Sequence, residues 1–539
     1  MGVSARTLEQ ARARNRLEWY RLGLYQRDDL GTVIARGLRA APGTELTFAH
    51  GGTRQTLTFG ELDLRSAAVA AGFVHAGLRP GDRVLVQLPS SVELVVTMVA
   101  ALRTGIVIVP LPTAAGEQHL EAALADSGAR LLVVPDEWRG VTHQTRLAAA
   151  AAVPALTTVL VTGPGAPADL AFDRLPGADA GAYVPRPLDP DAPCALIYTS
   201  GSSGRPKGVL HSHNALLTEV STGWAGLSGE DVRRTFVPLP PGHVGGLVST
   251  LIPLVTRRAA GFLEPWDRDG ALALIRDVGA TVMGSVPFFL AALLDGAGPG
   301  DLAPLAFSSQ GGAGVPAVLV ERADAVGVLV ARSYGLTEHP TVTAGSADDP
   351  FEVRAHTDGR VTPGNRVRIV DDVGRDVPRG AVGEIVTLGP ELMVGYTDPE
   401  QDLAAHLPGG WFRTGDLGRI DTGTAALVVT GRLKEIIIRG GENIAAADVE
   451  QVLFRHPDVA DAAVVGVPDA RYGERVLAVV VPRDGAAVDL TAIRSHFAAA
   501  GAGRLLTPEL LRVVVELPRG ATGKVLRRRL QQDWQGRGG

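Results

Sequence analysis

The chain has 539 residues, of which 45% are hydrophobic and 20% charged, and its formal net charge is -6. This length predicts several domain-sized units with large cores, and the acidic balance gives no electrostatic reason to expect nucleic acid as a partner. We expect no membrane span, because no segment supplies about 20 clean apolar residues. The single cysteine, Cys194, excludes an intrachain disulfide, and with no secretory signal evident we expect a cytoplasmic location.

The first 40 residues predict amphipathic helices that lead into the first domain. Leu17, Tyr20 and Leu24 recur at helical spacing, with charged residues opposite to them. Apolar runs then predict strands at residues 82–87, 106–111, 130–135, 158–162 and 195–199, a helix at 92–102 and an alanine-rich helix at 147–153. This alternation predicts a layered α/β fold with mostly parallel sheets.

The pattern changes over residues 361–421, where short β-rich runs are separated by Gly, Asp and Pro. Such spacing predicts an antiparallel sheet or a small barrel. Beyond Gly431 the remaining chain, about a hundred residues, is long enough for a compact α+β unit. The sequence therefore predicts a large N-terminal domain of layered α/β subdomains with a small β-barrel-like part, followed by a small α+β domain.

The segment with the most informative chemistry follows the strand at residues 195–199. It reads Tyr198-Thr199-Ser200-Gly201-Ser202-Ser203-Gly204-Arg205-Pro206-Lys207-Gly208. Glycines let backbone N–H groups approach a phosphate, hydroxyls donate further hydrogen bonds, and Lys207 adds a positive charge. Pro206 stands where a Walker A loop needs glycine, so the segment is not that motif. A phosphate-binding loop is the functional interpretation, and a flexible Gly/Ser surface loop is the alternative.

Seven further segments follow this loop in a fixed order. They are Pro238-Leu239-Pro240-Pro241-Gly242-His243, Gln310-Gly311-Gly312-Ala313-Gly314, Tyr334-Gly335-Leu336-Thr337-Glu338, Gly383-Glu384-Ile385, Gly410-Trp411-Phe412-Arg413-Thr414-Gly415-Asp416, Gly431-Arg432-Leu433-Lys434-Glu435-Ile436-Ile437 and Leu517-Pro518-Arg519-Gly520-Ala521-Thr522-Gly523-Lys524. In order and spacing the series resembles the adenylate-forming superfamily of acyl-CoA synthetases, adenylation domains and luciferases. It is most similar to bacterial fatty-acid and cyclohexanecarboxylate CoA ligases.

The resemblance implies a reaction, its cosubstrates and a domain division. A carboxylic acid is activated with ATP and Mg²⁺ as acyl-AMP, pyrophosphate is released, and the acyl group passes to CoA. The implied domains are residues 1–431, which bind ATP and the acid, and residues 432–539, a mobile lid. Lys434 occupies the hinge at 432–434. A lid that rotates can serve both half-reactions at one site.

The resemblance also implies a set of nucleotide ligands. The β- and γ-phosphate ligands are Thr199, Ser200, Gly201, Ser202, Ser203, Gly204 and Lys207. Thr337 is expected at the α-phosphate and Glu338 at magnesium, since a carboxylate is a hard oxygen ligand. The structural alternative for this pair is a helix-capping Thr followed by a first-turn Glu. Lys524, in a glycine-flanked turn, is expected to place one cation between the acid and the α-phosphate.

Adenine and ribose are expected to lie along a further set of positions. These are Gly311, Gly312, Ala313, Tyr334, Gly335, Asp416 and Arg432. Missing side chains let a flat base contact backbone, and Tyr334 offers an aromatic plane, with a core tyrosine as its alternative. The carboxylate of Asp416 can accept both ribose hydroxyls, assisted by Arg432.

The acyl pocket is expected among residues that the resemblance assigns by position. They are His243, Val244, Gly245, Gly246, Val286, Phe288 and Gln310. His243 is expected to act as a gate toward the thiol and is counted with Lys524, Glu338 and Thr337 as catalytic, although a lone His is often structural. Relatives that activate α-amino or catechol acids carry Asp or Asn at position 244, so Val244 favours a mainly apolar aliphatic, alicyclic or aryl acid. Gly440 and Gly441 are expected to line a pantetheine tunnel.

Several functional alternatives share the phosphate machinery. In one alternative a carrier protein or an amine replaces CoA as the acceptor, and in another an unusual oxyanion such as nitrite, passed on to an arylamine, replaces the acid. A regulatory nucleotide-binding protein without turnover is disfavoured by intact Lys207, Glu338, Asp416 and Lys524. Luciferase-type oxidation is remote, since it needs a special substrate. The particular acid and the oligomeric state, including a homodimer, stay open.

Overall fold

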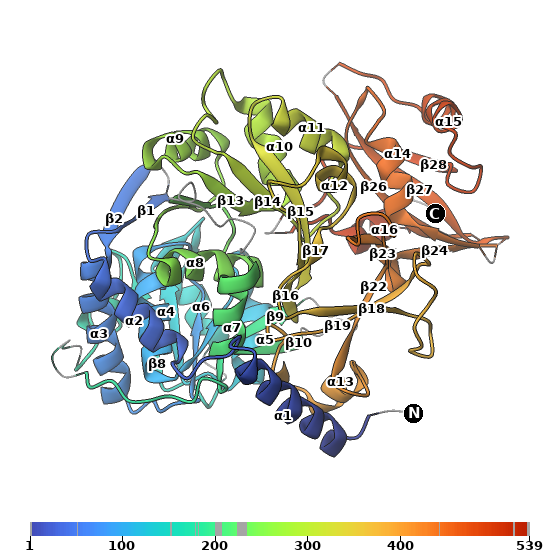
Figure 1. Cartoon of the computed structure of the whole chain (residues 1–539). Coiled ribbons are helices and arrows are strands. Elements are labelled where there is room, and N and C mark those ends of the chain that lie inside the picture. Colours follow the sequence, from blue (N-terminus) through green and yellow to red (C-terminus); the bar gives the residue numbers. More distant parts are fainter. Residues whose placement is uncertain are drawn as a thin grey trace.

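The structure is a computed structural model of the whole chain and is shown in Figure 1. It describes residues 3–50, 52–150, 153–177, 179, 181, 183–199, 207–223, 234–440, 442–469, 471–483, 485–520 and 523–535. The larger N-terminal part contains stacked sheets and helices, and the orange and red C-terminal part lies at one side of it. Within the described residues, no helix is both long and apolar enough to cross a bilayer.

A seven-stranded sheet has the order β20-β10-β9-β4-β3-β5-β8. Its strands are β3 (Arg83–Val86), β4 (Val107–Pro110), β5 (Leu131–Pro135), β8 (Thr158–Thr162), β9 (Pro193–Thr199), β10 (Lys207–Ser212) and β20 (Gly395–Tyr396). From β9 to β8 all pairs are parallel, and β10 joins antiparallel to β9. The strands predicted from apolar runs are confirmed, because strands buried on both faces are apolar throughout.

A nine-stranded sheet has the order β17-β16-β15-β14-β13-β11-β12-β1-β2. Its strands are β1 (Glu45–His50), β2 (Thr53–Thr58), β11 (Arg234–Val237), β12 (Ala259–Leu263), β13 (Val282–Ser285), β14 (Phe307–Gln310), β15 (Leu329–Leu336), β16 (His339–Ala344) and β17 (Arg360–Val361). The central strands are parallel, whereas β2, β16 and β17 pair antiparallel with their neighbours. The expectation of mostly parallel layered sheets is therefore confirmed.

Helices fill the space between these sheets and cover both outer faces. The largest buried apolar cluster joins strands of both sheets through α2 (Leu30–Ala40), α3 (Phe59–His75), α4 (Val92–Thr104) and α8 (Val244–Thr256). Outer helices are α5 (Glu117–Ser127) and α6 (His143–Ala150) on one sheet, and α9 (Arg268–Val278), α10 (Pro287–Gly296), α11 (Ala317–Asp324) and α12 (Phe351–His356) on the other. Shorter elements are α7 (His213–Thr218), the π-helix η3 (Glu219–Gly223), the 3-10 helix η1 (Phe172–Arg174), β6 (Glu137–Trp138) and β7 (Val141–Thr142).

The first helix, α1 (Ala5–Arg21), buries a different face from the predicted one. Leu17 is 70% exposed, whereas Leu8, Ala11 and Trp19 are buried. Arg12 pairs with Asp402 through both carboxylate oxygens at 2.8 and 2.9 Å, which fixes the rotation of the helix. The predicted helix is confirmed and its predicted contact face is wrong, because Leu8, Ala11 and Trp19 form another row at helical spacing, and this row packs against the protein beside the Arg12–Asp402 pair.

The region from Arg366 forms the predicted antiparallel sheet. Its strands are β18 (Arg366–Val370), β19 (Gly383–Leu388), β21 (His406–Leu407), β22 (Trp411–Ile420) and β23 (Leu427–Arg432), and α13 (Pro399–Ala404) precedes β21. Its inner side chains Ile369, Ile385 and Leu427 pack against Tyr334 of β15. The sheet thereby packs against the β15 side of the nine-stranded sheet.

The C-terminal unit is a five-stranded sheet with helices on both faces. Its elements are β24 (Ile436–Arg439), β25 (Glu442–Ala445), α14 (Ala446–Leu453), β26 (Val459–Asp469), β27 (Gly473–Pro482), α15 (Leu490–Ala499), β28 (Leu510–Val513) and α16 (Arg527–Gln535), preceded by the 3-10 helix η5 (Leu433–Glu435). Helices α14 and α15 share one apolar cluster, and Leu530 of α16 belongs to another. The α+β expectation is confirmed.

Candidate active site

The ends of the parallel strands and the C-terminal loop meet in one cleft. A Cβ atom added to Gly312, just beyond β14, would lie 3.5 Å from Cε and 3.9 Å from Nζ of Lys524. The same position would lie 3.5 Å from Cγ1 of Val286, just beyond β13. The structure thus brings a lysine near the C-terminus against a glycine strip more than 200 positions earlier in the chain.

A tight turn presents Lys524 to this cleft. The Gly520 N–H donates to the Lys524 carbonyl at 2.8 Å, and the Gly523 N–H donates to the Gly520 carbonyl at 2.9 Å. Gly523 has a φ of 76°, in the left-handed region that favours glycine. Ala521 and Thr522 lie outside the described residues. The hydrogen bonds close the turn at its base, and the lysine side chain extends from the turn toward Gly312.

Lys524 experiences opposing electrostatic influences in the cleft. Its side chain keeps exposed surface, and its ammonium group lies beside Gly312. Burial lowers its pKa first, the charge of Arg432 lowers it further, and the carboxylates of Asp416, Glu435 and Glu338 counter the shift. An anionic ligand beside Lys524 would favour its charged form in the same way.

The two ends of the glycine-rich loop are paired with each other. Thr199 ends β9 and Lys207 begins β10, and the two residues are register partners in the sheet. The Lys207 ammonium lies 4.7 Å from the ring centroid of Tyr396. The predicted ligands between them, Ser200, Gly201, Ser202, Ser203 and Gly204, lie outside the described residues. The structure therefore describes the two ends of the loop and not the residues between them.

Thr337 and Glu338 lie in a turn between β15 and β16, so the helix-cap alternative is wrong. His211 Nε2 lies 2.8 Å from the Thr337 carbonyl, and the Met393 N–H donates to the Glu338 carbonyl at 2.8 Å. The Tyr396 hydroxyl donates to Glu338 Oε1 at 2.5 Å. Backbone and carboxylate of Glu338 are thus held by residues that sequence reasoning missed, because nothing in their local pattern points to a site.

Gly335 makes this turn possible. A Cβ atom there would lie 1.7 Å from the Pro340 carbonyl oxygen, so any side chain would displace β16. Gly311 is similarly enclosed, since its Cβ would lie 2.7 Å from Ser333 Oγ. Gly312 has a φ of 72°, and the next residue, Ala313, is exposed. These glycines are required by close backbone approach, and they leave a side-chain-free strip beside Lys524.

Asp416 joins the antiparallel sheet to the linker before the C-terminal unit. Its Oδ2 accepts the Tyr334 hydroxyl at 2.8 Å, and its Oδ1 lies 2.7 Å from Arg432 Nε. Burial raises the pKa of Asp416, while Arg432 and the Tyr334 hydroxyl counter the shift. Tyr334 is buried with its hydroxyl engaged, so both of its predicted roles, core residue and nucleotide neighbour, are compatible with its position.

The donor set fits a magnesium ion held partly by substrate. Among the residues that the structure describes, no group of three His, Cys, Asp or Glu side chains lies close enough to hold a metal. Mg²⁺ at nucleotide sites usually takes one or two carboxylates together with phosphate oxygens and water. Glu338 is one such carboxylate, half-buried and oriented by Tyr396.

His243 and Gln310 are fixed at the predicted acyl pocket. Burial, and secondly the charge of Lys524, lower the pKa of His243 to about 4, so its imidazole is neutral at pH 7. In the described part of the chain, its Nε2 has no hydrogen-bond partner. The Gln310 amide nitrogen donates to Ser285 Oγ at 2.8 Å and Ser308 Oγ at 2.7 Å. Only the Gln310 carbonyl oxygen is left for a further hydrogen bond.

Gly245 and Gly246, two residues of the predicted acyl pocket, differ in role. A Cβ on Gly246 would lie 1.9 Å from the Pro240 carbonyl oxygen, so this glycine lets α8 pack on the preceding loop. A Cβ on Gly245 would meet only Leu239 Cδ1, at 3.4 Å. Close packing of α8 therefore requires glycine at position 246. Of these two positions, only Gly245 has space for a larger side chain.

We therefore expect Gly246→Ala to lower the free energy of unfolding by about 3 kcal/mol, since the added methyl clashes with backbone. Gly245→Ala is the matched control and is expected to change it by less than about 1 kcal/mol. Thermal and urea unfolding of both variants measure the difference. Equal stabilities would contradict the packing role.

The predicted tunnel segment lies in the hairpin of β24 and β25. Gly440 has a φ of 59°, and its N–H donates to the Tyr472 carbonyl at 2.7 Å. This hairpin is attached to β27 of the C-terminal sheet through Arg439. Gly441 lies outside the described residues. The structure thus places Gly440 on the C-terminal unit, apart from the glycine strip at Gly312.

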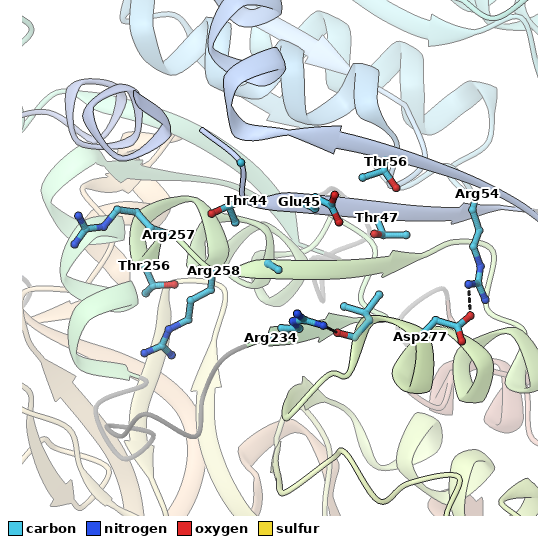
Figure 2. A pocket seen from close by; sticks show the side chains of 13 residues that line it. Thr44, Glu45, Thr47, Arg54, Thr56, Arg234, Thr256, Arg257, Arg258 and Asp277 are labelled. Carbon is cyan, nitrogen blue, oxygen red and sulfur yellow. Dashed lines mark hydrogen bonds and ion pairs between the residues drawn. The ribbon is translucent and has the colours of Figure 1, made fainter. Parts of the chain in front are cut away.

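An open pocket of about 750 Å³ lies elsewhere and contains none of the predicted residues (Figure 2). It is formed where β1, β11 and β12 begin, at the opposite ends of these strands from the cleft. Arg54 pairs with Asp277, and Arg234 donates to the Val278 carbonyl at 2.6 Å. Figure 2 shows that the guanidinium groups of Arg257 and Arg258 extend in different directions. The arginines of this pocket converge on no common point.

Layered parallel sheets, a glycine-rich loop after β9, the Thr337-Glu338 turn and a lysine delivered by a small C-terminal unit define an adenylate-forming enzyme. The sequence model described as AMP-binding enzyme matches residues 37–397, and the one described as AMP-binding enzyme C-terminal domain matches residues 448–524. The chain belongs to this family, the adenylate-forming superfamily.

Relatives and solved structures agree with this membership. The chain is 36% identical over 484 residues to sulfoacetate–CoA ligase of Cupriavidus necator, covering 88% of this chain and 92% of that protein. It is 31% identical over 548 residues to medium-chain fatty-acid–CoA ligase of Escherichia coli, covering 99% and 94%. The crystal structure of ATP-bound MatB from Rhodopseudomonas palustris superimposes with a TM-score of 0.84 at 30% identity, covering 94% of this chain and 99% of that one.

Proposed function

We propose that this protein activates a carboxylic acid with ATP and transfers the acyl group to CoA. A carboxylate oxygen attacks the α-phosphorus, the bond to pyrophosphate breaks, and an acyl-adenylate forms. The thiol of CoA then attacks the acyl carbon, and AMP leaves. The placement of Lys524 beside Gly312, within reach of the charges of Glu338 and Asp416, is the observation that carries the proposal. Relatives named as CoA ligases support CoA as the acceptor.

Different residues of the cleft bind different parts of the substrates in this proposal. Lys207 and the loop before it hold the outer phosphates, Asp416 holds the ribose, and Lys524 stabilises charge where the acid meets the α-phosphate. Glu338, oriented by Tyr396, would hold Mg²⁺, which when bound neutralises phosphate charge. Neutral His243 stands at the junction of the acyl pocket and the thiol path. These roles extend the family membership to particular residues of this chain.

The acid is proposed to be mainly apolar, with room for one polar group. Val244 offers no charge to an α-ammonium group, and the Gln310 carbonyl is a fixed, buried acceptor for one hydroxyl or amine. The two reported relatives are named for quite different acids, a short sulfonated acid and a medium-chain fatty acid. Aliphatic, alicyclic and aryl acids therefore belong in the same test.

The test uses purified protein with ATP, magnesium and a panel of acids, with CoA supplied or omitted. We expect AMP, pyrophosphate and a thioester to accumulate in equal amounts over many turnovers, and such turnover only when CoA is present. Turnover without CoA, with a carrier protein or an amine as acceptor, would instead support the alternative acceptors. Nitrite with an arylamine belongs in the same panel. The proposal would be contradicted if no acid and no oxyanion of the panel supported pyrophosphate exchange.

The boundary at residues 432–434 is proposed as the hinge for the second half-reaction. Arg432 ends β23, and Lys434 lies in the short 3-10 helix η5 before the C-terminal sheet. We expect Lys434→Pro to leave pyrophosphate exchange within about 3-fold of the parent and to slow thioester formation at least about 10-fold, because proline restricts the backbone rotation. Separate assays of the two half-reactions measure this, and an equal loss in both would contradict a hinge. Lys434→Ala controls for loss of the side chain.

A further inference from the structure

The loop that carries Lys524 rests on one side chain of the N-terminal domain. The Arg519 guanidinium carbon lies 5.4 Å from the ring centroid of Phe288, the second residue of α10. A Cβ atom on Gly523 would lie 3.2 Å from the Phe288 Cβ. Phe288 therefore lies against Arg519 and Gly523, the two ends of the turn that directly precedes Lys524.

Arg519 is held in place within its own domain. One guanidinium nitrogen pairs with Asp461 of β26, and another donates to the Gly523 carbonyl. Arg519 also forms an isolated bridge with Val525 across the turn. Since these bonds fix the guanidinium plane relative to the turn, a contact of that plane with Phe288 fixes the position of Lys524 as well.

Phe288 is not needed for the core of the N-terminal domain. It is 39% exposed, whereas its neighbour Phe289 is 3% exposed and lies 4.5 Å from Trp266 between ring centroids. The Phe288 ring lies 5.4 Å from that of Phe289 in its own helix, and its remaining exposed surface gains contact area when the C-terminal unit is docked. The exposed ring and the internally braced arginine thus form a contact between domains.

We propose that Phe288 is a positioning residue, which through Arg519 holds the C-terminal domain in the arrangement that adenylates and so keeps Lys524 at Gly312. The inference rests on the proposed function and adds to it a residue that influences the equilibrium between the two domain arrangements. A contact present in only one arrangement shifts the populations by its own free energy. Its loss therefore slows the step that needs this arrangement and spares the other.

The test compares Phe288→Leu with Phe288→Tyr and Phe351→Leu. We expect Phe288→Leu to slow pyrophosphate exchange about 3-fold, the effect of one partly exposed cation–π contact. Thioester formation from supplied acyl-adenylate is expected to keep the parental rate. Phe288→Tyr keeps the aromatic face and should restore the exchange. Phe351→Leu removes a comparable contact with Arg354, 6.0 Å from the ring, inside the N-terminal domain and should change neither step.

A second readout needs no substrate. Spin labels at Ala325→Cys, directly after α11, and at Ala499→Cys, the last residue of α15, occupy exposed positions in the two domains, and the native Cys194 is buried. We expect Phe288→Leu to broaden the interdomain distance distribution relative to the labelled parent. An unchanged distribution overturns the inference, as does an effect confined to the KM of the acid, which would assign Phe288 to the acyl pocket. If the parent adenylates no acid, the proposed function fails, while the distance measurement still decides this contact.

Discussion

Replacing Lys524 with alanine is expected to slow adenylation about 100-fold or more, a loss of about 3 kcal/mol in transition-state stabilisation. Lys524 is the cation that the C-terminal turn brings against Gly312, near the carboxylates of Asp416 and Glu338. Without it, no comparable charge is delivered between the acid and the α-phosphate. Pyrophosphate exchange measures the step directly, and thioester formation from supplied acyl-adenylate should continue near the parental rate.

Two controls make the Lys524 result specific. Arg529→Ala removes an exposed cation of the nearby helix α16 and is expected to leave pyrophosphate exchange unchanged. Thermal unfolding of Lys524→Ala should match the parent, because an exposed side chain in a turn adds little to stability. Exchange by Lys524→Ala at the parental rate would remove the lysine from the mechanism.

Asp416→Asn is expected to lower kcat/KM for ATP by about 30-fold or more, since losing a hydrogen bond to a charged group costs about 2 kcal/mol. Asp416 is 2% exposed and pairs with Arg432 at 2.7 Å. The asparagine would leave Arg432 without its counter-charge and would offer the ribose one acceptor oxygen in place of two. Exchange kinetics at varied ATP and calorimetric titration of ATP measure the loss.

The matched control for Asp416 is Asp372→Asn. Asp372 lies in the exposed turn that follows β18 of the same antiparallel sheet, so its substitution removes the same charge far from the cleft. Its kcat/KM for ATP should equal that of the parent. If Asp416→Asn binds ATP as tightly as Asp372→Asn, the ribose role is wrong and the residue serves only to join β22 to Arg432.

Strands and their order along the chain follow from local chemistry. The apolar runs at β3, β4 and β5 are each bounded by polar or turn-forming residues, and a strand buried on both faces needs such a run. The glycine-rich loop, the Thr337-Glu338 turn and the Lys524 turn also stand out, since each combines glycine with groups that bind oxyanions. These features are local, so one sequence suffices to find them.

Contacts between distant segments were not predictable in the same way. The face of α1 that contacts the protein is the one from which Arg12 reaches Asp402, 390 residues later in the chain. Whether a side chain fits at position 246 is set by the nearby Pro240 carbonyl. A helical period states which residues share a face, but not which face meets the protein. The partner of each side chain is set by packing, which periodicity does not encode.

The sequence by itself therefore determined the layered α/β class and the family, and it predicted the residues proposed for the nucleotide site. Tertiary structure alone decided that Tyr396 orients Glu338, that Asp416 joins Tyr334 to Arg432, and that Phe288 receives the Lys524 turn. The physical reason is separation along the chain. Folding brings such partners together through the packing of whole sheets and domains, so no short segment carries the information.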